Sequence, residues 1–136
     1  MPYTDKELID AAAAVRENAF APHSGFRVGS ALETEDGELL TGCNVESASY
    51  GLTMCAERVA IFTAVSKGKK KIKKIAVVTD TDQLTAPCGA CRQIIWEFGG
   101  DIPVVLSNLH GKTQTVQMRE LLPRAFDSTY LSEPPA

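Results

Sequence analysis

Long apolar runs are missing from this chain of 136 residues, and their absence narrows what the protein can be. Uncharged apolar stretches such as Ile75–Val78 and Pro103–Leu106 are far shorter than the roughly 18–20 residues that a membrane helix needs. The segment Met1–Asp10 also has no basic-then-apolar pattern of the kind that directs export. We therefore expect no membrane partner and a cytoplasmic location.

Internal repeats, low-complexity segments and interdomain linkers are absent as well. Apolar residues make up 44% of the chain and charged residues 23%, which is typical of a folded globular protein. At roughly 100–200 residues per domain, the length fits a single domain over residues 1–136. Residues 132–136 contain two prolines, and we expect them to form a frayed tail.

Basic residues are scarce outside one short cluster, Lys67–Lys74. The net charge is −3, but this cluster holds six of the fourteen Lys and Arg, and the rest of the chain has eight basic against seventeen acidic residues. An acidic surface of this kind repels phosphate backbones. The lysines lie where a helix is expected to end, a position at which cations favour the helix dipole. We therefore expect a solvated face and no nucleic-acid partner.

Periodicity and turn residues predict an alternation of helices and strands. Thr4 and Glu7 have the spacing of a capping box, and apolar residues follow at helical intervals, so a first helix is predicted over Thr4–Ala19. Asp36-Gly37 separates the apolar runs Val28–Leu32 and Leu39–Cys43, which indicates an antiparallel hairpin. The other predicted elements are helices at about 54–66 and 88–98, strands at 72–78, 103–106 and 113–116, and a short helix at 119–122.

The order of these elements predicts an α/β fold of three layers, α/β/α, in which a mixed five-stranded sheet has helices on both faces. Only residues 108–112 separate the last two strands, so their pairing must be antiparallel, because a parallel return needs about a dozen or more residues. Right-handed crossovers would place the helices at 54–66 and 88–98 on one face of the sheet. Their N-termini would then be neighbours.

Cysteines are few, and three of the four can meet at those two N-termini. Cys88 and Cys91 form a C-x-x-C motif, which serves redox proteins and metal sites alike, and Cys55 lies at the start of the preceding helix. Three thiolates with an open fourth position are typical of catalytic zinc, whereas structural zinc normally has a full set of protein ligands. Cys43 would complete such a set, but it lies in a strand pattern, where a free cysteine is often a small buried hydrophobe.

Charged residues beside these cysteines suit a catalytic site. Thiolates make zinc a weaker Lewis acid, so positive charge is needed, and Arg58 and Arg92 are placed to donate charged hydrogen bonds to sulfur. Glu57 can approach the same ion at the helix terminus, where its carboxylate would take a proton from activated water and pass it to a leaving group. The only histidines, His23 and His110, adjoin no ligand, and we expect them at the surface.

Cys55-Ala56-Glu57 and Pro87-Cys88-Gly89-Ala90-Cys91 form the cysteine version of the zinc deaminase signature. Together with the segments 21–29, 42–50 and 120–123, they closely resemble the cytidine deaminases of the small homotetrameric type, over about residues 4–126. The resemblance implies hydrolytic deamination of cytidine and 2'-deoxycytidine with release of ammonia, in pyrimidine salvage. It also implies one Zn²⁺ per subunit, a small nucleoside as substrate, and a homotetramer with shared active sites.

The resemblance assigns a role to each residue that matches the family's motifs. Cys55, Cys88 and Cys91 would bind zinc, and Glu57 would shuttle protons. Arg58 and Gln93 would support these groups without binding the metal. The implied substrate-binding residues are Phe26 against the pyrimidine, Asn44 and Glu46 at the ribose hydroxyls, Ala48, Tyr50, Ala56 through its backbone, and Phe126 from a neighbouring subunit. Phe20 and His23 stand where many relatives carry tyrosine, so the hydrogen bonds of those tyrosines at the pocket entrance are in question.

Three alternatives remain open at this point. The first is a deaminase of a modified aminonucleoside such as blasticidin S, although Asn44-Val45-Glu46 beside Ala48-Ser49-Tyr50 favours an ordinary ribose. The second is a structural zinc module, which would need Cys43 as a further ligand and would show no turnover. The third is a C-x-x-C redox protein, which would carry no metal and would cycle a disulfide.

Overall fold

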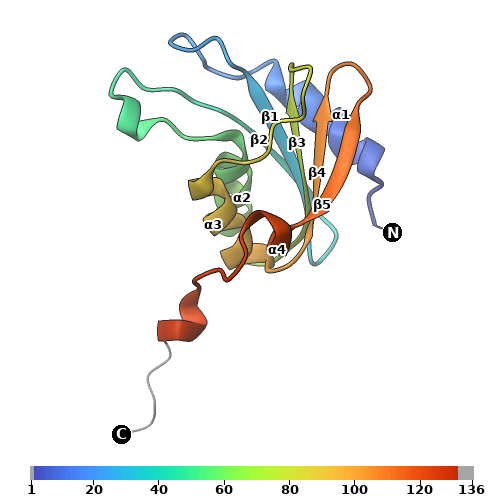
Figure 1. Cartoon of the computed structure of the whole chain (residues 1–136), viewed down its shortest axis with the longest axis vertical. Coiled ribbons are helices and arrows are strands. Elements are labelled where there is room, and N and C mark those ends of the chain that lie inside the picture. The colour runs from blue at the N-terminus through green and yellow to red at the C-terminus, as the bar shows by residue number, and fades with distance from the viewer. Residues whose placement is uncertain (1, 132–136) are drawn as a thin grey trace, which may run out of the picture.

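A five-stranded mixed sheet forms the centre of the computed structural model, which describes residues 2–131 (Figure 1). The strand order is β2-β1-β3-β4-β5; only β3 and β4 pair in parallel, and the predicted antiparallel pairing of β4 with β5 is confirmed. The strands are β1 (Val28–Thr34), β2 (Leu39–Cys43), β3 (Ile72–Thr79), β4 (Pro103–Asn108) and β5 (Thr113–Gln117). The tail predicted at 132–136 lies outside the described residues.

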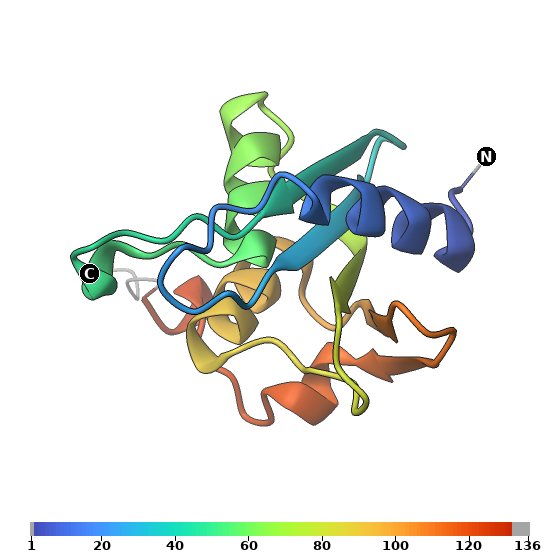
Figure 2. The same cartoon turned by 90° about the horizontal axis from the view of Figure 1, so that it is seen from above.

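Helices cover both faces of this sheet, which confirms the predicted fold class (Figure 2). They are α1 (Asp5–Arg16), α2 (Ala56–Ser66), α3 (Gly89–Gly99) and α4 (Met118–Leu121), with two 3-10 turns, Tyr50–Leu52 and Ser128–Leu131, that the sequence did not predict. The first helix ends at Arg16 and not at Ala19 as predicted. The spacing of apolar residues predicted a longer helix because Ala19 is buried, but it is buried in the segment after the helix end.

In the described part of the chain, α1 is the one helix that packs on its face of the sheet, opposite α2 and α3. Its predicted capping box is present: the Thr4 hydroxyl accepts from the Glu7 amide at 3.1 Å, and the Glu7 carboxylate accepts from the Thr4 amide at 2.9 Å. Leu8 and Ala12 are buried against the sheet. The approach is close at Gly29 of β1, where an added Cβ would lie 1.9 Å from the Ala12 carbonyl oxygen, so this position admits only glycine.

The helices α2 and α3 pack side by side on the opposite face, as the right-handed crossovers predicted. Ile61 of α2 and Ile95 of α3 are fully buried against Ile75 of β3 and Val104 of β4. The helix α2 connects β2 to β3, and α3 connects β3 to the parallel strand β4. Both helices therefore begin at the same edge of the sheet. This edge carries the candidate site.

The lysine cluster is largely neutralised by acidic residues of neighbouring elements. Lys69 contacts Asp36 at 2.5 Å and Lys74 contacts Asp5 at 2.7 Å, while Lys73 reaches the buried Glu33 at 3.1 Å. These ion pairs agree with the predicted solvated face. Within residues 2–131, no helix combines the length and apolar character needed to cross a membrane.

Candidate active site

Three cysteine sulfurs converge where α2 and α3 begin. Cys55 and Cys88 are the N-cap residues of the two helices, in extended backbone conformation, and Cys91 lies in the first turn of α3. The three Sγ atoms lie within 4.8 Å of one another, and those of Cys55 and Cys88 are 3.8 Å apart. Tetrahedral zinc with Zn–S bonds of about 2.3 Å places two sulfurs about 3.8 Å apart, so the spacing fits this metal.

The surroundings favour the thiolate form that zinc needs. Hydrogen bonding from the Cys91 thiol, and then from Arg58 and Cys88, lowers the pKa of Cys55 to about 5 although burial opposes the shift. The amide dipoles at the starts of α2 and α3 add positive potential at the sulfurs. Cys43 lies apart in β2, where burial raises the pKa of its thiol, and it is not in the sulfur group.

Glu57 lies in the first turn of α2 and is only 4% exposed. Burial raises the pKa of its carboxyl to about 7, with a smaller contribution from the nearby Cys55. A carboxyl whose pKa is near neutrality both accepts and returns protons readily, as general acid–base catalysis requires. Its side chain lines the cavity next to Cys55, so the structure places a carboxyl that can exchange protons beside the three sulfurs.

The two arginines beside the cysteines behave differently. Arg58 donates from Nη2 to the Cys55 sulfur at 3.4 Å, as expected. The prediction that Arg92 also donates to a thiolate is wrong: its Nε donates to the Pro87 carbonyl at 2.7 Å and its Nη1 to the Leu121 carbonyl at 2.9 Å. The side chain turns toward α4 because these carbonyl groups, one before α3 and one at the end of α4, have no helical partner. Arg92 therefore fixes the backbone that leads into Cys88.

Gln93 also faces the C-terminal segment. Its Nε2 donates to the Phe126 carbonyl at 2.8 Å and to the Glu97 carboxylate at 3.1 Å. These bonds hold the segment after α4 against α3. The structure thus gives Gln93 a contact with the backbone of Phe126 and not with a cysteine sulfur.

Replacing Arg58 by glutamine tests the contribution of its charge. We expect Arg58→Gln to retain zinc and to lower kcat about 10–100-fold with little change in KM, because a positive hydrogen-bond donor to Cys55 is lost. Steady-state kinetics with metal analysis measures both effects. Arg119→Gln, an exposed arginine of α4, serves as the control. A raised KM with unchanged kcat would place Arg58 in substrate binding instead.

A cavity of about 250 Å³ opens beside the sulfurs. Five of the predicted site residues besides the cysteines line it: Phe26, Asn44, Glu46, Ala56 and Glu57. The lining residues that the sequence did not single out are Ser24, Val28, Thr53, Val77, Thr79, Thr85 and Ala86. Val77 and Thr79 lie at the carboxyl end of a parallel strand, where ligands commonly bind in α/β sheets, so their position was a usable signal.

Three other predicted substrate-binding residues lie on the surface of the chain. Ala48 is exposed, Tyr50 is 75% exposed in a segment that projects from the body, and Phe126 is 55% exposed with its ring stacked on Tyr130 (Figure 1). None of them lines the cavity. The two histidines are exposed, as expected, with His23 in edge contact with the Tyr50 ring at 5.6 Å.

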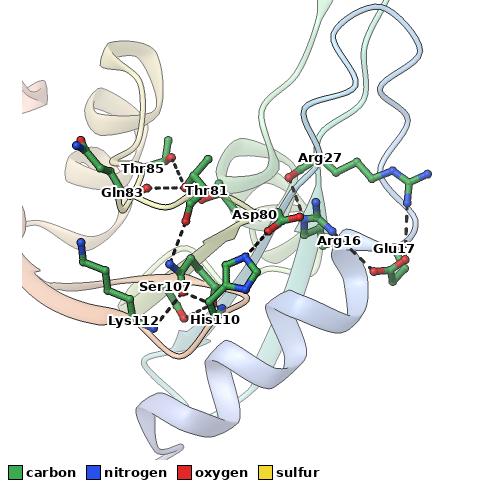
Figure 3. Close-up of polar contacts among 12 residues, drawn as sticks. Arg16, Glu17, Arg27, Asp80, Thr81, Gln83, Thr85, Ser107, His110 and Lys112 are labelled. Carbon is green, nitrogen blue, oxygen red and sulfur yellow. Dashed lines mark hydrogen bonds and ion pairs between the residues drawn. The ribbon is translucent and has the colours of Figure 1, made fainter.

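The loop of residues 80–87, which leads from β3 to Cys88, is braced by the turn between β4 and β5 (Figure 3). The buried Asn108 donates to the Thr81 carbonyl at 3.0 Å and accepts from the His110 and Lys112 amides. His110 also pairs with Asp80 at 2.9 Å. The wall of the cavity formed by this loop is therefore held from outside the site.

Comparison with known proteins agrees with this geometry. The family model described as "Cytidine and deoxycytidylate deaminase zinc-binding region" matches residues 2–107. The cytidine deaminase of Sporosarcina psychrophila is 48% identical over 128 residues, which cover 93% of this chain and 94% of that protein. The blasticidin-S deaminase of Bacillus cereus is 33% identical over 107 residues, 73% of this chain and 76% of that protein.

A solved structure extends the likeness to three dimensions. The crystal structure of cytidine deaminase from Burkholderia pseudomallei superposes with a TM-score of 0.88 at 50% identity, covering 91% of this chain and all of that one (100%). The match to the family model spans residues 2–107 and so includes the N-termini of α2 and α3. The chain belongs to the cytidine and deoxycytidylate deaminase family, and its metal is zinc.

Proposed function

We propose that this protein is an enzyme that hydrolyses cytidine and 2'-deoxycytidine to uridine and 2'-deoxyuridine with release of ammonia. The observation that carries the proposal is the buried Glu57 beside three sulfurs at zinc spacing, at the end of a cavity of nucleoside size. Among residues 2–131, those that line the cavity include no Lys, Arg or His, which suits a neutral nucleoside better than a nucleotide. The similarity to cytidine deaminases at 48% identity supports the same substrate.

The chemistry follows from the positions of the side chains. Cys55, Cys88 and Cys91 would hold the zinc ion, which when bound would supply an activated water for attack at C4 of the base. Glu57 would take one proton from that water and pass it to N3 of the base, and would then take the proton of the hydroxyl on C4 and pass it to the departing amine. Arg58 and the helix dipoles offset the negative charge of the thiolates.

The other cavity residues would orient the substrate. Phe26 would lie against the flat face of the pyrimidine, and the backbone of Ala56 would contact its edge. Asn44 and Glu46 would take the ribose hydroxyls. A neutral sugar is well recognised by an amide and a carboxylate, since these offer both donors and acceptors.

A side-by-side assay tests this function. Cytidine, 2'-deoxycytidine, cytidine monophosphate, adenosine and blasticidin S are each followed by ultraviolet absorbance, and zinc per chain is measured on the same sample. We expect stoichiometric zinc and turnover of the first two substrates. Zinc without turnover would support a structural module, preferential turnover of blasticidin S would support the alternative deaminase, and disulfide exchange without metal would support a redox protein.

We also propose that the protein is a homotetramer in which Phe126 reaches the cavity of a neighbouring subunit. Support comes from exposed apolar residues that one chain leaves without cover, among them Leu52, Phe126, Tyr130 and Leu131. The bond from Gln93 to the Phe126 carbonyl holds the segment in place from its own subunit. A subunit contact over the cavity would exclude water from it.

Removal of the Phe126 ring tests this shared site. Light scattering of the unaltered protein should give a mass near four chains, and Phe126→Ala should raise KM for cytidine about tenfold while the zinc content stays the same. Leu109→Ala, which removes an apolar residue exposed in the turn after β4, is the matched control. A monodisperse monomer with full activity would overturn the proposal.

The cellular setting is proposed to be the cytoplasm, with a role in pyrimidine salvage. All four cysteines are free thiols, and three of them have the spacing of zinc ligands, which suits a reducing compartment. The products, uridine and 2'-deoxyuridine, are nucleosides that a salvage reaction can consume.

A further inference from the structure

Residues 23–28 form one wall of the cavity, and side chains hold this wall in place. The hydroxyl of Ser24 donates to Oε2 of Glu46, and the Oγ atom of Ser24 accepts from the Phe26 amide at 3.0 Å. Ser24 thus connects Glu46, proposed to bind the sugar, with Phe26, proposed to lie against the base. No sequence motif assigned a role to this serine.

Glu46 is bound by the same wall at its other oxygen. Its Oε1 accepts from the His23 amide at 2.8 Å and from the Ser24 amide at 3.1 Å. The Ser24 hydroxyl is also the main cause that holds the pKa of Glu46 below its ordinary value. Glu46 therefore stays ionised and faces the cavity in one orientation.

Asn44 holds the wall independently of Ser24. Its Oδ1 accepts from the Val28 amide at 2.9 Å, and its Nδ2 donates to the Phe26 carbonyl at 2.7 Å. Asn44 is only 7% exposed, and because it lies two residues from Glu46 in an extended segment, both side chains point to the same side. Loss of the Ser24 hydroxyl would therefore remove the bond to Oε2 of Glu46, while the backbone amides still hold Oε1 and Asn44 still holds the Phe26 carbonyl.

We infer that Ser24 is a positioning residue that sets the Glu46 carboxylate for recognition of the sugar hydroxyls. The inference rests on the proposed function, in which Glu46 binds the ribose. The hydroxyl of Ser24 already gives its only proton to Glu46, so it has no donor left for substrate. Its effect on the sugar would pass through Glu46, whose ionised oxygens accept hydrogen bonds from the sugar, whereas an effect on the base would pass through the Phe26 amide.

This mechanism predicts an effect that depends on the sugar. Ser24→Ala should raise KM for cytidine about tenfold and leave kcat within about twofold, because a hydrogen bond to a charged group is lost but Glu57 and the zinc ligands are untouched. With 2',3'-dideoxycytidine, which lacks the hydroxyls that Glu46 would bind, the same substitution should change KM less than about twofold. Ser24→Thr, which keeps the hydroxyl, should restore the KM for cytidine.

Two further measurements make the test decisive. Ser66→Ala, at the end of α2 and away from the cavity, controls for loss of a serine hydroxyl and should leave both constants unchanged. In a Glu46→Gln background, Ser24→Ala should add less than about a twofold further change, because its partner is already altered. Equal effects on the two substrates, or additive effects in the double variant, would overturn the inference.

Failure of the inference differs from failure of the proposed function. If the unaltered protein does not deaminate cytidine at all, the proposed function is wrong. If it does, and Ser24→Ala has no effect on KM or the same effect on both nucleosides, only the role of Ser24 is wrong.

Discussion

Glu57→Gln is expected to lower kcat about 10²–10⁴-fold while zinc and fold are retained, since a positioned acid–base group contributes that much. Glutamine has the shape of glutamate, and Glu57 is not in the sulfur group, so neither packing nor metal ligation changes. The carboxyl is 4% exposed with a pKa of about 7, so a neutral amide is readily accommodated there. Only the ability to accept and return a proton is lost.

Steady-state kinetics and metal analysis on the same preparation measure this effect. Glu35→Gln, an exposed glutamate at the β1–β2 turn, is the matched control and should behave like the unaltered protein. A Glu57→Gln variant that keeps more than about a tenth of the activity would contradict the assigned role.

Cys88→Ala is expected to abolish activity through loss of the metal. The three sulfurs have a spacing that fits tetrahedral zinc, and the substitution reduces them to two. Metal affinity depends on the complete set of deprotonated ligands. Zinc per chain should fall from about one to near zero. Because binding energy of the metal contributes to folding, the melting temperature should fall too.

Cys43→Ala provides a control of the same chemistry. Cys43 lies in β2 outside the sulfur group, so this variant should keep zinc and turnover. Stoichiometric zinc in Cys88→Ala would refute the three-thiolate site. Loss of zinc in Cys43→Ala would instead indicate a fourth protein ligand.

Local signals in the sequence were sufficient for most of the fold. The capping box of α1 and the Asp36-Gly37 turn, with Gly37 at a φ of 89°, each specify structure through contacts a few residues apart. The short connection between β4 and β5 determined their antiparallel pairing by chain length alone. The convergence of Cys55 with Cys88 followed from the handedness of crossovers, which is general to parallel strands.

Side-chain direction was decided only by tertiary structure. Arg58 and Arg92 both lie a few residues into their helices, yet one bonds a sulfur and the other turns to the carbonyl of Leu121, 29 residues away in the chain. The bonds of Ser24 to Glu46 and of Asn108 to Thr81 likewise join segments far apart in sequence. A polar side chain bonds whichever unpaired group the packing of the fold brings within about 3 Å of it. No local sequence pattern encodes that distance.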